Sequence, residues 1–233
     1  MIVRRSNERG YMDHGWLQTH HSFSFASYYD PLHIHYRSLR VLNDDTIAPH
    51  AGFPPHPHDN MEIVTCVLNG SVTHTDSMGF QDTIHAGECQ LISAGSGMTH
   101  SEMNHGATPL RLLQIWVIPD RQHTPPAYHV IRPQWANRRN HAHLMAAPAA
   151  SGSVDGVLPI SQDVSIRMGH FDAGVMTNLC IEKGRHLYLY VIDGWVAIGG
   201  VLGTPGDALM GVSDGMITLD ILRPAHLLVF DLK

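Results

Sequence analysis

The sequence predicts an all-β protein built from two similar β-domains, and three observations lead to this prediction. The 21 glycines and 14 prolines make up 35 of the 233 residues, which is typical of chains with many turns and short strands. Most apolar runs are short and end at turn-forming residues. A set of glycine-centred turns also occurs twice in the same order. With 43% hydrophobic and 15% charged residues, the chain can bury a core of its own.

Strands are expected wherever these apolar runs meet turn-forming residues. In the first half, the Asn69-Gly70 dipeptide is favoured in tight hairpin turns and joins two such runs. The strands predicted for the first half are 38–42, 62–68, 71–75 and 110–118. Those predicted for the second half are 164–168, 186–192, 195–198 and 226–232.

The stretch between the two halves has a different composition. Residues 124–156 are rich in proline, alanine and other small residues, which predicts an irregular crossover with at most one short helix. We therefore expect an N-terminal domain at 1–120, a linker or crossover at 121–155 and a C-terminal domain at 156–233.

The two halves repeat one another at three turns. Residues 67–72 (VLNGSV) parallel residues 191–196 (VIDGWV), and two further glycine turns follow in each half. The further pairs are 86–88 with 205–207 and 96–98 with 214–216. Three aligned turns in the same order indicate a duplicated β-unit.

The composition argues against several classes of function. Lys and Arg total 15 against 21 Asp and Glu, a net charge of −6, whereas a nucleic-acid or anionic-membrane surface usually needs a basic excess. The apolar runs are shorter than the ~20 residues of a membrane span, and no apolar signal segment follows the N-terminus. Cys66, Cys89 and Cys180 form no CxxC pair, which fits a reducing compartment. We expect a cytoplasmic protein that binds neither nucleic acid nor membranes directly.

The 19 histidines are the unusual feature of the composition, and their positions decide which of them carry chemistry. His56 and His58 are separated by one residue, so both imidazoles point to the same face of a strand. His100 and Glu102 have the same spacing and follow a glycine-rich turn. Three neutral nitrogens and one carboxylate form an open metal site, unlike the closed four-ligand site of structural zinc.

Glu62 is a second candidate for the carboxylate. It has the same parity as His56 and His58, so it is also expected to face the interior, and spacing alone leaves the choice open. Glu102 is favoured because it is paired locally with His100.

Two other histidine pairs share this spacing, His33 with His35 and His141 with His143. Neither pair is followed by a Glu and a Gly at suitable distances, so these side chains are expected to be exposed or to cap local structure.

The order Gly-x3-His-x-His-x3-Glu-x7-Gly, followed by a glycine-rich turn, His100 and Asn104, resembles the two cupin motifs. The finer sequence is similar to the pirin family of two-domain cupins, most densely over residues 7–118. The segments that carry this resemblance are 7–10 (NERG), 14–17 (HGWL), 21–26 (HSFSFA), 29–31 (YDP), 39–41 (LRV), 52–63, 93–98 (SAGSGM) and 100–104 (HSEMN).

This resemblance implies two cupin β-barrels stacked face to face, with one metal in the N-terminal barrel. The family's ligands carry over onto His56, His58, His100 and Glu102, and the final strand or the N-terminal segment is expected to be exchanged between the barrels. In the second barrel, the same count along the chain reaches four residues that are not histidines, so that barrel is expected to be degenerate and without a metal. These four residues are Cys180, Glu182, Thr218 and Asp220.

The resemblance further implies a metal-dependent dioxygenase that cleaves flavonols such as quercetin with O₂. Glu102, or alternatively Glu62, would act as general base on a substrate hydroxyl group. Fe(II) is the first expectation for the metal, with Ni, Co, Mn, Cu or Zn as alternatives. The alternative function is a metal- or redox-sensing regulatory protein that acts through a protein partner.

Overall fold

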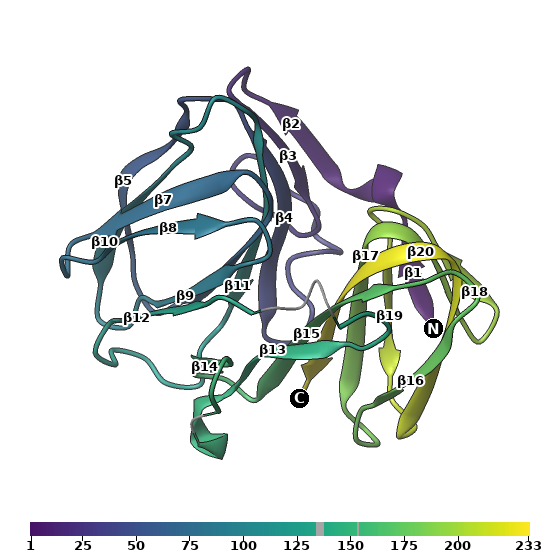
Figure 1. Cartoon of the computed structure of the whole chain (residues 1–233). Helices are drawn as coiled ribbons and strands as arrows, with labels where there is room; N and C mark the ends of the chain where they lie inside the picture. The colour runs from purple at the N-terminus through teal and green to yellow at the C-terminus, as the bar shows by residue number, and fades with distance from the viewer. Residues whose placement is uncertain (134–137, 153) are drawn as a thin grey trace. The chain divides into compact units, whose positions relative to one another are not determined.

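The computed structural model describes residues 1–133, 138–152 and 154–233, and these residues form mainly β-strands (Figure 1). The helices among them are short 3-10 turns at Ser6–Glu8 (η1) and Ala149–Ser151 (η3). No described helix is both long and apolar enough to span a membrane. Contacts divide the chain into two compact units. The N-terminal unit comprises Gly10–Pro133 and Gly152–Gln162, and the C-terminal unit comprises Met1–Arg9, Gln134–Ser151 and Asp163–Lys233.

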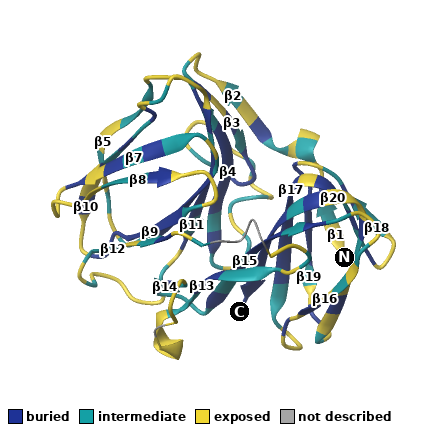
Figure 2. Ribbon diagram, in the orientation of Figure 1, coloured by how far each residue is buried: buried dark blue, intermediate teal, exposed yellow. Residues whose placement is uncertain are grey.

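The N-terminal unit has two antiparallel sheets. One sheet has the order β12-β9-β6-β11-β4-β3-β2, and the other has the order β5-β10-β7-β8. Their strands are β2 (Gly10–Asp13), β3 (Leu17–His21), β4 (Leu39–Ile47), β5 (Gly52–His58), β6 (Glu62–Asn69), β7 (Ser71–Asp76), β8 (Gln81–His85), β9 (Cys89–Ser93), β10 (Met98–Met103), β11 (Leu110–Val117) and β12 (Ala127–Ile131); β14 (Leu158–Ile160) lies in the same unit. Buried side chains are concentrated on the central strands of the larger sheet (Figure 2).

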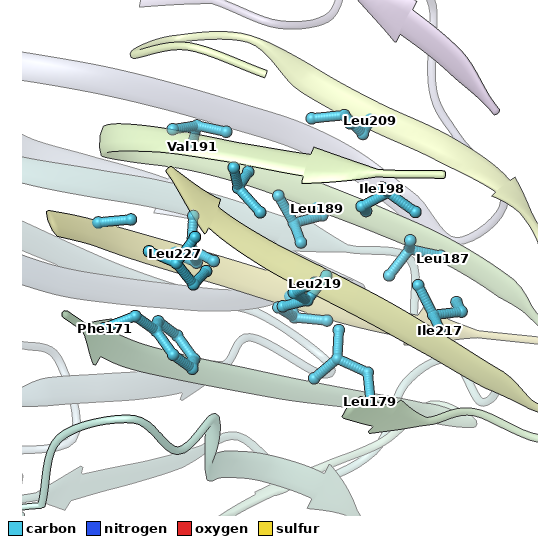
Figure 3. Packing of buried hydrophobic residues seen from close by; sticks show 14 of the residues in the cluster. Phe171, Leu179, Leu187, Leu189, Val191, Ile198, Leu209, Ile217, Leu219 and Leu227 are labelled. Carbon is cyan, nitrogen blue, oxygen red and sulfur yellow. The ribbon is translucent and has the colours of Figure 1, made fainter. Parts of the chain in front are cut away.

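The C-terminal unit has a sheet with the order β1-β19-β17-β20-β15-β13, in which β16 also pairs with β20 and β18 with β17. Its strands are β1 (Ile2–Arg4), β13 (His143–Pro148), β15 (Val164–Phe171), β16 (Met176–Cys180), β17 (His186–Ile198), β18 (Val201–Gly203), β19 (Ala208–Val212) and β20 (Met216–Leu232). An aliphatic cluster that includes Leu179, Leu189 and Ile217 fills its interior (Figure 3).

The residues expected to form a linker contain two strands, so that expectation is wrong in part. β12 pairs with β9, and β13 pairs with β15. Pro125 and Pro126 precede β12, Pro133 follows it, and Pro148 is the last residue of β13. The prolines therefore mark strand ends, where a missing N–H donor is tolerated, and do not interrupt the strands.

The apolar runs did not predict β5, whose sequence is Gly-Phe-Pro-Pro-His-Pro-His, although the spacing of His56 and His58 assumed a strand there. β5 is an edge strand that pairs only with β10, so its three prolines do not remove hydrogen bonds from a second neighbour. Gly52 is required there, because a Cβ at this position would lie 2.3 Å from the Glu102 carbonyl oxygen. A close approach of β5 to β10 thus depends on a residue without a side chain.

The turn predicted at Asp193-Gly194 is a distortion inside one strand. Residues 186–192 and 195–198 belong to the single strand β17, whose register with β20 shifts between Val191 and Val196. Gly194 has φ +81°, and a Cβ there would lie 2.0 Å from the Pro224 carbonyl oxygen. The equivalent Gly70 does separate two strands, β6 and β7, as predicted.

The N-terminal residues are bound to the C-terminal unit by one buried carboxylate. β1 pairs with β19, and Asp207 accepts hydrogen bonds from Arg5 Nη1 at 2.8 Å and from the Ser6 backbone N–H at 2.7 Å. The N–H and hydroxyl groups of Thr204 donate to the same carboxylate, each at 3.0 Å.

Asp207→Ala should lower the free energy of unfolding by about 2–3 kcal/mol, because it leaves the Arg5 guanidinium, two backbone N–H groups and one hydroxyl group without this acceptor. The exposed Asp214→Ala, in the same unit, is the control and should change stability by less than about 0.5 kcal/mol. Urea unfolding measures both values, and equal effects of the two substitutions would contradict the proposed anchoring.

Candidate metal centre

The antiparallel pairing of β5 with β10 brings three histidines together. His56 lies directly opposite His100 in this pairing, and His58 lies opposite Met98. The ring centroids are 4.5 Å apart for His56 and His100, 4.8 Å for His56 and His58, and 4.9 Å for His58 and His100. One ligand nitrogen from each ring lies within 4.8 Å of the others. This is the only such group of potential metal ligands found in the part of the chain that the structure describes.

The hydrogen bonds of these histidines leave lone pairs for an ion. His56 Nδ1 lies 2.8 Å from the Pro54 carbonyl oxygen, and because a carbonyl only accepts, Nδ1 carries the proton and Nε2 is the free ligand atom. His100 is 2% exposed, and neither of its ring nitrogens has a hydrogen-bond partner among the described residues. A buried imidazole without partners is costly unless a ligand satisfies it, so these residues fit a metal ion.

Glu102 follows His100 on β10 after an irregularity in the pairing with β5. Its Oε1 accepts hydrogen bonds from Gln90 Nε2 at 2.6 Å and from the Thr65 hydroxyl at 2.9 Å, and its Oε2 accepts one from Gln114 Nε2 at 2.8 Å. The carboxylate is buried and borders the same cavity as the histidines. Neutral donors hold Glu102 at this cavity, without a cationic partner among these contacts. The group of ligand atoms within 4.8 Å of one another contains the three histidines and not Glu102, so its role as fourth ligand stays a prediction.

The expectation that Glu62 faces the histidines, which rested on the parity of its position, is wrong. Ile63 on the same strand borders the cavity, so the alternation of β6 points Glu62 to the opposite face. There its Oε2 accepts hydrogen bonds from the Ser93 hydroxyl at 2.9 Å and from the Ser161 N–H at 3.1 Å. Alternation cannot be counted from His58 to Glu62 because the two residues lie on different strands. Residues 59–61 separate β5 from β6, and Asn60 adopts a left-handed conformation with φ +47°.

A cavity of about 180 Å³ opens onto the histidines. Its walls are largely aromatic and aliphatic, with a few polar side chains. The residues that line it are Phe25, Asn43, Asp45, Phe53, His56, His58, Ile63, His100, Glu102, Gln114 and Trp116. The enclosed volume accommodates about one aromatic ring, since a cavity of about 150 Å³ binds benzene.

Asp45 is a cavity residue that the sequence analysis missed. Burial raises the pKa of its carboxyl group from 3.8 to about 7, against the opposing hydrogen bond with Thr19. Its Oδ1 has no hydrogen-bond partner among the described residues. The signal in the sequence was weak, because Asp45 occurs in Asn43-Asp44-Asp45, a cluster that predicts a turn but continues β4.

Side chains that do not line the cavity contact His100 and a hydrogen-bond partner of Glu102. The His74 ring lies 5.4 Å from the His100 ring, and His74 Nε2 contacts Asp76 Oδ2 at 2.9 Å in a fully buried pair. Tyr128 stacks on His74 with the ring centroids 4.4 Å apart, and its hydroxyl group donates a hydrogen bond to Gln90 Oε1 at 3.1 Å. Because Gln90 in turn donates to Glu102, the predicted linker contributes Tyr128 to the support of the carboxylate.

The other histidine pairs have local partners, as expected for capping residues. His33 Nδ1 lies 2.7 Å from Asp30 Oδ2, and His35 Nδ1 lies 2.9 Å from the Arg37 carbonyl oxygen. His143 Nε2 lies 2.7 Å from the Arg138 carbonyl oxygen, and the His141 ring packs against that of His143.

The three cysteines are free thiols. Cys66 and Cys89 lie opposite each other on β6 and β9, and Cys66 has the parity of Glu62, so it also points away from the histidines. A hydrogen bond with Cys66 and burial raise the pKa of the Cys89 thiol well above its usual range. Cys66 is 1% exposed, as expected for a small core residue.

The four positions counted in the second barrel do not form an equivalent group. Cys180, Glu182 and Thr218 are exposed, and Asp220 alternates with the buried Leu219. In the pairing of β16 with β20, Thr218 lies opposite Asn178 and not opposite Cys180. The inward-facing positions of these strands are aliphatic instead, with Leu179, Ile217 and Leu219 in the core cluster.

Two family models match two separate parts of the chain. Residues 2–117 match the family model described as pirin, and residues 144–232 match the one described as the quercetinase C-terminal cupin domain. The quercetin 2,3-dioxygenase of Escherichia coli K12 is 38% identical over 233 residues, covering 100% of this chain and 98% of the relative. The chain belongs to the pirin family. Its fold is accordingly nearly all-β, with two cupin domains.

Two solved structures of pirins carry the same fold. YhhW from Escherichia coli matches with a TM-score of 0.93 at 38% identity, covering 100% of this chain and 97% of that one. The bacterial pirin YhhW in complex with nickel(II) matches with a TM-score of 0.92 at 37% identity, covering 99% and 98%. A relative thus binds a divalent transition metal, and this pirin has a three-histidine group that could bind one.

The electrostatics of the centre keep its buried imidazoles neutral. Burial, together with neighbouring histidines, lowers the pKa of His58 from 6.5 to about 4 and that of His100 from 6.5 to about 3. Neutral imidazoles are the ligand form, so these two residues remain ready for a metal well below neutral pH.

The metal-free protein should lose stability as the pH falls from 6.5 toward 4. In this window the unfolded chain binds protons at His58 and His100 that the folded chain does not bind, so the free energy of unfolding decreases with decreasing pH. His58→Gln removes one of these groups and should reduce the loss between pH 7 and pH 5 by about 1 kcal/mol, after discounting for solvent exposure. Urea unfolding with a chelator present tests this, and an equal loss in variant and wild type would contradict it.

Proposed function

We propose that this pirin is a metal-dependent dioxygenase that opens flavonols such as quercetin with O₂. The observation that carries the proposal is the three-histidine group, in which the buried His100 has no hydrogen-bond partner on either ring nitrogen, together with the adjoining cavity that Phe25, Phe53 and Trp116 help to line. The relatives named quercetin 2,3-dioxygenase support the same reaction class.

We assign His56, His58 and His100 as metal ligands and Glu102 as a fourth ligand that shares its carboxylate with the nearby donors. When bound, a divalent transition metal supplies Lewis acidity toward an oxyanion and electron exchange with O₂. Fe(II) remains our first choice, and the nickel(II) complex of a relative makes Ni(II) the first alternative.

Glu102 is also the proposed general base. A carboxylate held by Gln90, Thr65 and Gln114 has a fixed position and is not neutralised by a cation in these contacts, so it can accept the proton of the flavonol 3-hydroxyl group. Asp45 borders the same cavity, and its raised pKa means that part of its population carries a proton near pH 7.

The walls of the cavity orient an aromatic substrate. Phe25 lies 5.3 Å from Trp116 in an edge-to-face contact, and His58 lies 5.0 Å from the same indole. Since the enclosed space holds about one ring, we expect the ring that bears the 3-hydroxyl group to enter and the rest of the flavonol to lie at the mouth. These apolar walls also exclude water from the reacting group.

The direct test is to load the purified protein with Fe(II) or Ni(II) and to follow flavonol absorbance together with O₂ uptake. Turnover should be absent from the metal-free protein and from His100→Ala, which should also lose most of its bound metal. Stoichiometric metal binding without turnover of any flavonol would contradict the proposal and would favour the regulatory function instead.

Glu102→Gln should lower kcat by about 10²–10⁴-fold, because the amide retains the shape of the carboxylate but cannot take up the proton. Glu62→Gln is the matched control, since Glu62 is equally buried but faces the other side of β6, and it should leave kcat within about 3-fold. Steady-state assays on proteins with equal metal content make the comparison. A larger loss for Glu62→Gln would return the role to that residue.

A further inference from the structure

The C-terminal unit contains a cavity of its own, about 220 Å³ in volume, at the edge strand β16. Aliphatic and polar side chains both line it. The residues that line it are His141, Ala142, Arg167, Thr177, Asn178, Leu179, Cys180, Ile181 and Val229. These residues belong to the C-terminal unit alone, so the cavity is independent of the metal centre.

Arg167 points toward the interior of this unit, where a charge is unexpected. It lies directly opposite Val229 in the pairing of β15 with β20, and directly opposed residues share one face of a sheet. Val229 and Phe171, which has the same parity as Arg167, both belong to the aliphatic core cluster. Figure 3 shows Phe171 among the inward-pointing side chains of this cluster.

The Arg167 guanidinium has no hydrogen-bond or ion-pair partner among the described residues, although it is half-buried. Two other arginines of the C-terminal unit do have partners. Arg185 pairs with Asp163 and Asp231, and Arg139 pairs with Asp172. The described residues that line the cavity include no carboxylate, so the permanent charge among them is positive. A partly desolvated guanidinium is a strong binding group for an anion.

One neutral donor borders the same cavity as Arg167 on the interior face of β16. Thr177 has the parity of the core residues Leu179 and Ile181, whereas Asn178 is exposed and its side-chain Oδ1 accepts a hydrogen bond from the Thr218 hydroxyl at 2.9 Å. The Thr177 hydroxyl has no side-chain partner among the described residues. In addition, β16 is an edge strand, so part of its backbone N–H groups face away from the sheet.

Residues 140–142 form one wall of the cavity and are held in place by contacts with residues 169–172. Gly169 lies between Arg167 and Phe171, and a Cβ there would be 2.2 Å from the His141 carbonyl oxygen. The Asn140 N–H donates to the His170 carbonyl oxygen at 2.7 Å, and the Asn140 side-chain amide donates to Asp172 at 2.9 Å. Only glycine at position 169 leaves room for residues 140–142. These residues in turn fix the shape of the cavity.

We propose that this cavity is a second small-molecule site, which binds an organic monocarboxylate with a short apolar or aromatic body. Arg167 holds the carboxylate, Thr177 adds a neutral donor, and Leu179, Ile181 and Val229 contact the apolar part. The cavity combines a cationic group with aliphatic side chains, and its volume exceeds the ~150 Å³ that holds one benzene ring.

Benzoate is the probe for this proposal, and the full-length protein is titrated with it while methyl NMR signals are followed. The signals of Leu179 and Val229 should shift with benzoate, whereas those of Val72 and Ile84, in the core of the N-terminal unit, should not. Benzyl alcohol has nearly the same shape without the charge and should bind at least about 10-fold more weakly.

Arg167→Gln should weaken benzoate binding by about 10-fold or more, and Arg167→Lys should restore part of it. Arg223→Gln is the matched control, since Arg223 stacks on Trp195 outside the cavity and should bind benzoate like the wild type. Melting curves of each variant establish that it is folded. Unchanged affinity in a folded Arg167→Gln protein, shifts confined to the N-terminal unit, or equal binding of inorganic phosphate and benzoate would each overturn the proposal.

Discussion

The register between β5 and β10 is the constraint on which the candidate metal centre depends. His56 must stand opposite His100, because a slip of one residue would turn the imidazoles of one strand to the other face of the sheet. Gly52 permits the close approach at the beginning of this pairing. The prolines of β5 are compatible with it because β5 is an edge strand. The placement of the three histidines therefore depends on the pairing of these two strands.

The second element of the centre is a carboxylate stabilised by neutral donors. Glu102 accepts hydrogen bonds from two amides and a hydroxyl group, and Tyr128 fixes one of these amides in turn. A salt bridge would hold the carboxylate more tightly but would cancel its charge, whereas neutral donors leave it able to bind a cation or a proton. The polar network therefore fixes the position of the carboxylate and leaves it without a cationic partner among these contacts.

The two cupin domains use similar strands for different interiors. In the N-terminal unit, alternate residues of β10 bring His100 and Glu102 to the cavity. In the C-terminal unit, the corresponding part of β20 presents Ile217 and Leu219 to an aliphatic core. What distinguishes the second unit chemically is Arg167, an inward-facing cation with no acidic neighbour in its cavity. The N-terminal unit thus contains a group of potential ligands for a cation, whereas the interior of the C-terminal unit is aliphatic around the inward-facing Arg167.

The sequence alone was sufficient for the all-β class, the duplication and the family, because these depend on turn residues and on motif order along the chain. It also identified His56, His58 and His100, since residues two apart on a strand share a face whatever the rest of the fold does. Only the tertiary structure decided against Glu62, because a left-handed residue at Asn60 breaks the parity count between two strands. It alone also revealed Asp45, Tyr128 and Arg167, whose neighbours are distant in sequence and meet only through strand pairing.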